Sequence, residues 1–71
     1  MHWEPEFFAR FRNTKDSRHF AEIHHTPGDQ HQYRVTYMLM GAHGNGVVKM
    51  NGVNHLSEAI TRLTESGYQR E

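Results

Sequence analysis

Histidine is the residue type with the clearest capacity for chemistry in this chain, which contains seven histidines and no cysteine. Imidazole nitrogens bind transition metals such as Zn²⁺ and Ni²⁺, and they exchange protons near neutral pH. His24 and His25 are consecutive, and His31 follows a run of turn-forming residues, Thr-Pro-Gly-Asp-Gln. If the segments on either side of this turn pair as a hairpin, His25 and His31 face each other with His24 beside them. These three residues are the candidate metal ligands.

Two facing imidazoles are fewer ligands than a functional metal site uses. Structural zinc has four protein ligands and catalytic zinc has three plus water. Solvent-facing histidines are the simpler interpretation, so no cofactor is expected, and metal binding is kept as an alternative. Fragments of a nucleophile and a base occur at Ser17 with His19 and Asp16, and at Ser57 with His55. A triad needs a third group that orients the base, and neighbours along a strand point to opposite faces, so the chain is not expected to be an enzyme.

The glycine-rich stretch GAHGNGVV, residues 41–48, has the composition of a phosphate-binding loop. A Walker loop requires a lysine and a hydroxyl residue directly after its last glycine, and two valines stand there instead. A dinucleotide fingerprint requires a helix after the glycines, whereas β-branched residues favour a strand. The stretch therefore predicts a hairpin turn, either at Asn45-Gly46 or as a four-residue loop over residues 42–45.

Alternation of apolar and polar residues predicts the strands around these groups. Residues 31–41 have a period of two that is typical of a strand with one buried face, with apolar positions at Tyr33, Val35, Tyr37 and Leu39. Residues 18–25 form a second strand. Residues 5–12 are predicted as a first strand, although Pro5 leaves a short helix as the alternative.

The hairpin registers follow from this alternation, because paired residues share a face of the sheet. The loop after the second strand must hold an odd number of residues, and the shortest such loop sets His25 opposite His31. In the next hairpin, either predicted turn places Val48 and Met50 on the face that carries Leu39.

An amphipathic helix is predicted after the fourth strand, with one apolar stripe formed by Leu56, Ala59, Ile60 and Leu63. Asn54 or Ser57 can cap its start, and Gly67 in the left-handed conformation ends it. The predicted fold is α+β: a four-stranded antiparallel sheet of β-hairpins with one C-terminal helix packed on one face, in a single small domain over residues 1–71. The large side chains expected in the core are Trp3, Phe7, Phe8, Phe11, Phe20, Tyr33, Tyr37 and the methionines.

Length and charge restrict the possible functions. A chain of 71 residues has a small core, and without cysteine it has no disulfide to strengthen it. Docking on a larger molecule or pairing with a second copy of the chain would compensate. The formal net charge is zero, which excludes a general attraction to polyanions. No apolar run is long enough to span a membrane, so a soluble, cytoplasmic protein without membrane contact is expected.

One local charge feature is typical of nucleic-acid contact. The basic cluster consists of Arg10, Arg12, Lys15 and Arg18, which surround Asp16 alone and carry about three net positive charges. Phenylalanines stand beside it, and basic residues interleaved with aromatics grip a phosphate backbone and stack on bases. The simpler interpretation is a charged strand edge that resists unwanted pairing.

The order of these segments resembles the WGR domain, a small antiparallel sheet with a closing helix. The similar pieces are FARFRNTKDSRHFAEI, YRVTYMLMGAHGNG, and LSEAITRL followed by Ser-Gly-Tyr, within residues 7–68. This resemblance implies nucleic-acid binding. The family's Trp-Gly-Arg signature stands here as Met40-Gly41-Ala42, in which only the glycine matches. HGNGVV followed by SEAITRL is also similar to the YegP-like family of small ββ-β-α units, which implies no catalytic residues.

These observations favour a non-catalytic protein that docks stoichiometrically on another protein or on a protein–nucleic-acid complex, as small phage-encoded inhibitors and regulators do. The docking surface is expected on an exposed strand edge or on the outer sheet face, where Arg34, Met38 and Met40 alternate with the buried positions. A WGR-like nucleic-acid module that uses the basic cluster is the first alternative, and metal binding through histidines is the second.

Overall fold

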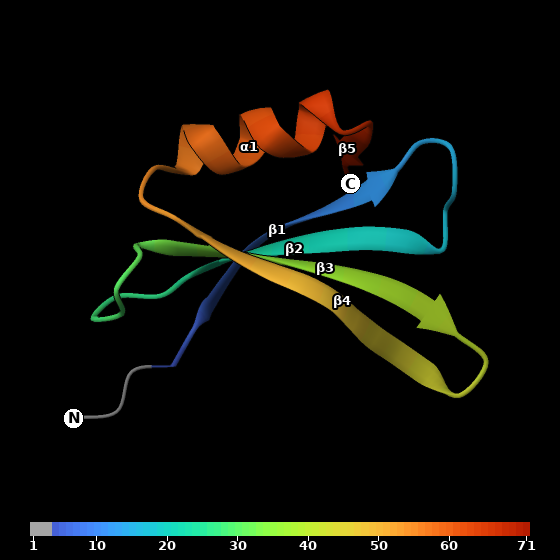
Figure 1. The fold of residues 1–71 in the computed structure, drawn as a ribbon, viewed down its shortest axis with the longest axis horizontal. Helices are drawn as coiled ribbons and strands as arrows, with labels where there is room; N and C mark the ends of the chain where they lie inside the picture. Colours follow the sequence, from blue (N-terminus) through green and yellow to red (C-terminus); the bar gives the residue numbers. More distant parts are fainter. Residues whose placement is uncertain (1–3) are drawn as a thin grey trace.

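The computed structural model describes residues 4–71, in which an antiparallel sheet is covered on one face by a helix (Figure 1). In chain order the elements are β1 (Glu6–Asn13), β2 (His19–His25), β3 (Tyr33–Gly41), β4 (Gly44–Val53), α1 (Leu56–Glu65) and β5 (Tyr68–Arg70). The strands of this part lie in the order β4-β3-β2-β1-β5. The predicted α+β class is confirmed, and β1 is a strand rather than the alternative short helix. Trp3, expected in the core, lies outside the described residues.

The sheet contains a fifth strand, so the expectation of four strands is wrong. After the C-cap Ser66, Gly67 has a φ of +85° and turns the chain back toward the sheet. Tyr68 then pairs with Asn13 of β1, and its ring meets the ring of Tyr37 edge-on, with 5.8 Å between the centroids. A strand of three residues has no alternation to detect in the sequence. It forms because this register packs Tyr68 against the core.

β2 and β3 pair in a different register from the expected one, because His25 lies opposite Tyr33 and not opposite His31. The loop between them is longer than the shortest odd loop. It is held by the buried Thr26, whose backbone N–H donates to the carbonyl of Gln32 at 2.9 Å and whose hydroxyl donates to the carbonyl of His31 at 2.8 Å. The loop still contains an odd number of residues, so the side chains of both strands keep their expected faces.

The β3–β4 hairpin turns between Gly41 and Gly44, which face each other across two residues. The expected turns, at Asn45-Gly46 or over residues 42–45, are therefore wrong. Gly44 has a φ of +128°, a conformation that residues with a side chain rarely adopt. The glycine that permits the turn thus stands at its end, and the Asn-Gly pair lies within the strand.

A bulge at Val48 changes the faces along β4. Val47 and Lys49 lie opposite consecutive residues of β3, so Val48 is an extra residue between them. Beyond the bulge, Met50 lies on the sheet face turned away from α1, and the expectation that it shares the face of Leu39 is wrong.

The core lies between α1 and the sheet. The helix stripe predicted to face the sheet does so, through Leu56, Ala59, Ile60 and Leu63. The strands contribute Ala9, Phe11, Ala21, Ile23, Val35, Tyr37 and Val53. The helix begins after the N-cap His55, which makes no side-chain cap, so the caps expected from Asn54 or Ser57 do not form. Packing of the apolar stripe, and not capping, therefore holds the helix in place.

Several large side chains expected in the core lie elsewhere. Phe7, Phe8, Met40 and Met50 are exposed. Phe20 is buried, but it lies on the sheet face turned away from α1. With only ten residues in α1, no helix within residues 4–71 is long and apolar enough to cross a membrane.

Candidate functional site

The sheet face turned away from α1, which we call the outer face, carries the residues predicted to contact a partner. Arg34, Met38 and Met40 alternate along β3 with residues that pack under α1, so all three share the outer face. Arg34 and Met38 are half-buried, and Met40 is exposed. The pairing of β3 with β4 adds Val47 and Met50 to the same face. The outer face therefore joins one guanidinium to several flexible apolar side chains.

Residues 39–50, which we call the arm, form the distal part of the β3–β4 hairpin and are all exposed. The cause is a difference in length between the elements. The ten residues of α1 extend about 15 Å, whereas the ten residues of β4 extend about 33 Å. Figure 1 shows the tip of the hairpin far from the helix. Leu39 therefore stays exposed on the helix side of the sheet, although its alternation predicts a buried position.

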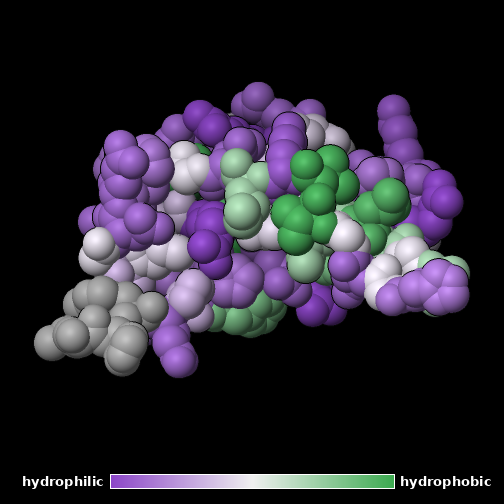
Figure 2. Space-filling model, turned by 60° about the horizontal axis from the view of Figure 1, so that its bottom comes forward, coloured by the Kyte–Doolittle hydropathy of each residue, from purple (hydrophilic) through white to green (hydrophobic). Residues whose placement is uncertain are grey.

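The arm holds most of the exposed apolar surface. Of the seven large apolar side chains exposed within residues 4–71, five lie on it: Leu39, Met40, Val47, Val48 and Met50. Figure 2, in which the side away from α1 comes forward, shows hydrophobic side chains gathered together rather than scattered. An apolar cluster that no other element covers favours an interaction surface.

Arginine side chains cover the part of the outer face next to the arm. Phe20 is only 3% exposed, because the guanidinium carbons of Arg10 and Arg12 lie 5.4 and 5.3 Å from the centre of its ring. Arg12 also donates to the sulfur of Met40 at 3.2 Å, which ties the arginine stack to the arm. The sequence pattern places Phe20 in the main core, and only the register reveals its arginine cover.

Ion pairs neutralise most of the basic cluster. They join Arg10 to Glu22 at 2.8 Å, Arg18 to Asp16 at 3.1 Å, and Arg12 to Glu71. Lys15 has no ion pair within residues 4–71. The cluster thus has four cations and three carboxylates, which gives a net charge of +1 instead of the expected +3. The difference arises because the fold brings in Glu22 from β2 and Glu71 from beyond β5.

Asp16 organises the loop between β1 and β2. Hydrogen bonds from the side chain and then the backbone of Arg18 hold the pKa of Asp16 below its ordinary value of 3.8, and the same ion pair raises the pKa of Arg18. The imidazole Nε2 of His19 lies 3.8 Å from this carboxylate. Arg18 is therefore the closer partner of Asp16.

The three candidate metal ligands do not come together. His24 and His25 are neighbours on β2 and point to opposite faces of the sheet. The ring of His31 packs over Gly52 of β4, where a Cβ atom would overlap it. In the part of the chain that the structure describes, no three His, Asp or Glu side chains are arranged to hold a metal ion.

Arg34 lies at the centre of a row of buried nitrogen atoms across the outer face. His24 lies opposite it on β2, and Gly52, under the ring of His31, lies opposite it on β4. Arg34 Nε and the Nδ1 atoms of both histidines are buried, and within residues 4–71 they have no hydrogen-bond partner. Buried polar groups normally find a partner, and because these three atoms have almost no exposed surface, an ordered water would reach them more readily than a group of another molecule.

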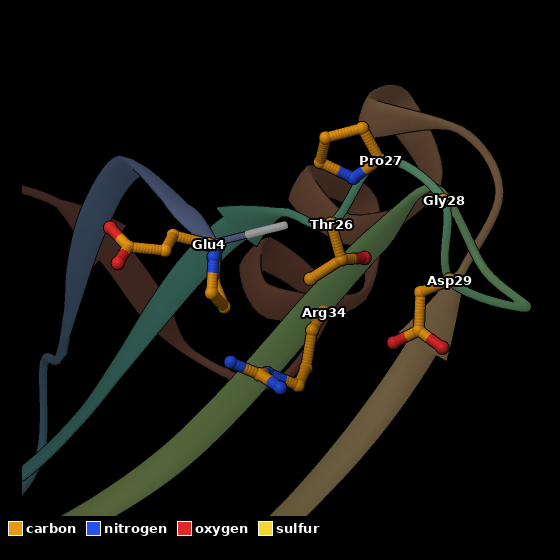
Figure 3. Close-up of a pocket in the computed structure, with 7 residues that line it drawn as sticks. Glu4, Thr26, Pro27, Gly28, Asp29 and Arg34 are labelled. Carbon is orange, nitrogen blue, oxygen red and sulfur yellow. The ribbon is translucent and has the colours of Figure 1, made fainter. Parts of the chain in front are cut away.

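A pocket of about 280 Å³ lies beside Arg34. Figure 3 shows the guanidinium group between Glu4 on one side and Asp29 on the other, with Pro27 and Gly28 forming the rim. Neither carboxylate forms an ion pair with Arg34 within residues 4–71. Arg34 therefore differs from Arg10, Arg12 and Arg18, each of which is engaged by a carboxylate.

The sequence pattern does not identify Val47 and Val48 as site residues. The signal that would find them is the length mismatch between the predicted helix and the predicted hairpin, which leaves part of the hairpin uncovered. No family model, curated protein or solved structure matches this chain. The WGR-like and YegP-like resemblances stay predictions, and the geometry of the arm and outer face is the basis for a functional interpretation.

Proposed function

We propose that the chain is a non-catalytic docking module that binds another protein, alone or within a protein–nucleic-acid complex, through the arm and the adjoining outer face. The observation that carries this proposal is the arm itself. Its residues are exposed on both faces, and its apolar side chains contribute nothing to the core. A two-stranded ribbon without a packed face is only marginally stable in water, so a partner that covers the arm would also stabilise it.

The side chains of this surface suit a protein partner. Met38, Met40 and Met50 are flexible and polarisable, and methionine adapts its shape to an irregular apolar surface. Arg34 lines a pocket and forms no ion pair within residues 4–71, so an acidic or carbonyl group of the partner that enters this pocket would bind its guanidinium group. Apolar contacts would supply affinity, and Arg34 would fix the orientation.

Binding to nucleic acid is the second candidate. Its support is the pair of guanidinium groups stacked on Phe20, together with Lys15, which forms no ion pair within residues 4–71. The ion pairs of the basic cluster count against it, because a phosphate contact by Arg10, Arg12 or Arg18 would first displace a carboxylate. Fluorescence anisotropy with labelled DNA at about 50 and 200 mM salt tests it. Binding that weakens with salt, and is lost in an Arg10/Arg12/Lys15 alanine variant, would favour this candidate.

Affinity capture with matched variants tests the docking proposal. The wild-type chain, Met40→Lys and Arg34→Gln are used as baits in a lysate of the source cells, and the retained proteins are identified by mass spectrometry. Phe8→Lys is the control bait, because Phe8 is exposed to a similar degree as Met40 but lies at the opposite side of the sheet, under Arg70.

A protein retained by the wild type and by Phe8→Lys, but lost with Met40→Lys and Arg34→Gln, supports the proposal. Titration calorimetry with that purified protein then gives the affinities, and the two arm variants are expected to bind at least tenfold more weakly. Circular dichroism establishes that each bait is folded. Partners that bind all four baits equally would contradict the proposed surface.

A further inference from the structure

The two edges of the sheet are built differently. β5 forms one edge with only three residues, including the charged Arg70. β4 forms the other edge with ten residues, and its outward backbone groups have no strand beside them within residues 4–71. Long, uncovered edges pair readily with another strand, and proteins usually protect them with proline or charge.

β4 has little of this protection. It contains no proline, and Lys49 is its only charged residue. The ammonium group of Lys49 lies 4.7 Å from the centre of the Tyr37 ring, on the helix side of the sheet, and so does not stand in the line of the edge. The bulge at Val48 bends the strand, and regular pairing with β3 continues on both sides of it.

We propose that two copies of the chain associate through β4, edge to edge and antiparallel, to form one continuous sheet around a two-fold axis. This inference does not rest on the docking function proposed above, although both involve the arm. The axis passes between Val48 and Lys49, at the midpoint of β4, so the whole strand is paired. Val47 of one copy then lies opposite Met50 of the other, and this contact occurs twice.

The bulge is what makes β4 complementary to itself. In a regular strand, residues three apart point to opposite faces. Here Val47 lies opposite Met38 and Met50 lies opposite Thr36, and both are therefore on the outer face. The same agreement of faces holds for the pairs farther from the axis, such as Gly46 with Asn51.

Charge also favours a second copy as the occupant. The chain has a formal net charge of zero, and the arm carries one lysine and one histidine among twelve residues, so two copies approach without strong repulsion. In the proposed register, each Lys49 lies opposite Val48 of the other copy and not opposite the other Lys49. Apart from Lys49, this edge carries no charged residue for an acidic or basic partner to recognise.

The contact between the two copies is small. A strand pair about 33 Å long, with a few apolar contacts beside it, falls below the roughly 1,200 Å² of a standard interface, so association in the micromolar range is expected. The outer faces of the two copies become continuous across the junction. Arg34 and Met38 lie on β3 and stay uncovered, so the dimer presents two docking surfaces side by side.

Sedimentation equilibrium over about 10 μM to 1 mM tests for association, a range that spans the expected dissociation constant. The mass is expected to rise from 8.4 kDa toward twice that value. Val47→Lys and Met50→Lys should weaken the dimer at least tenfold, whereas the Phe8→Lys control should not. Hydrogen exchange at the two ends of the range should show added protection of β4 amides in the dimer.

Cross-linking tests the register, because the chain has no cysteine of its own. Single-cysteine variants Val47→Cys and Met50→Cys are mixed and oxidised, and the disulfide-linked species are resolved by mass. Directly opposed residues satisfy disulfide geometry, so the mixed disulfide should form faster than either symmetric one. A monomer throughout the concentration range, a dimer without protection of β4, or symmetric disulfides in preference to mixed ones would overturn the proposal.

Discussion

Replacing Phe20 with alanine is expected to destabilise the fold by about 2–4 kcal/mol, although Phe20 lies outside the core under α1. Its ring is almost fully buried on the outer face by the side chains of Arg10 and Arg12. Truncating a buried phenylalanine in a core costs about 3–5 kcal/mol. The expected value is lower because the flexible arginine side chains can settle into part of the space. A chain of this length has only about 4–11 kcal/mol of total stability, so the effect is large.

Urea unfolding followed by far-ultraviolet circular dichroism measures this loss. Phe20→Leu, which keeps most of the apolar volume but removes the ring, isolates the stacking of the guanidinium groups. Each exposed cation–π contact contributes about 0.5–1 kcal/mol, so Phe20→Leu should cost roughly 1–2 kcal/mol more in the wild type than in an Arg10→Met/Arg12→Met background. A loss below about 1 kcal/mol for Phe20→Ala, or the absence of coupling in this cycle, would refute the arginine cover as the reason for burial.

Three further variants follow from the same geometry. Gly52→Ala places a Cβ atom against the ring of His31, so unfolding measurements should show a loss of about 1–3 kcal/mol that His31→Ala largely restores. Gly67→Ala forces a side chain into a φ of +85° and should cost about 1–2 kcal/mol, whereas Gly46→Ala, with open space around it and no positive φ, should be tolerated. Burial raises the pKa of Tyr37 above its ordinary 10.0. Stability should therefore fall as pH rises from about 10 through the higher folded-state pKa, and the urea midpoint of Tyr37→Phe should fall less steeply in this range.

The elements that depend on local pattern could be predicted from the sequence. The period of two in β3 and the apolar stripe of α1 both reflect burial against a neighbouring layer, and the structure confirms the stripe and, as far as Tyr37, the buried face of β3. Gly67 ends the helix as expected, because a left-handed residue at that position favours glycine.

The registers could not be predicted, because they depend on contacts between distant segments. The hydrogen bonds of Thr26 lengthen the loop before β3, and this separates His25 from His31. The pairing of β1 with β2 brings Glu22 to Arg10, and the pairing of β5 with β1 brings Glu71 to Arg12. Together these two carboxylates remove most of the positive charge expected from neighbours in the chain. Two candidate sites are predicted from short-range spacing. For this reason, the structure does not bring the histidine group together, and it leaves the basic cluster with less positive charge than expected.

The bulge at Val48 explains why Met50 does not share the face of Leu39, and it is also the basis of the proposed association. Alternation assumes that each residue of β4 has one partner on β3, and the extra residue breaks that rule at the middle of the strand. As a consequence Met50 moves to the outer face and leaves the helix side, where α1 is in any case too short to cover the arm. Within a single chain this arrangement only exposes apolar surface. Between two copies it places Val47 opposite Met50 twice, so the feature that weakens the isolated hairpin is the one that makes its edge self-complementary.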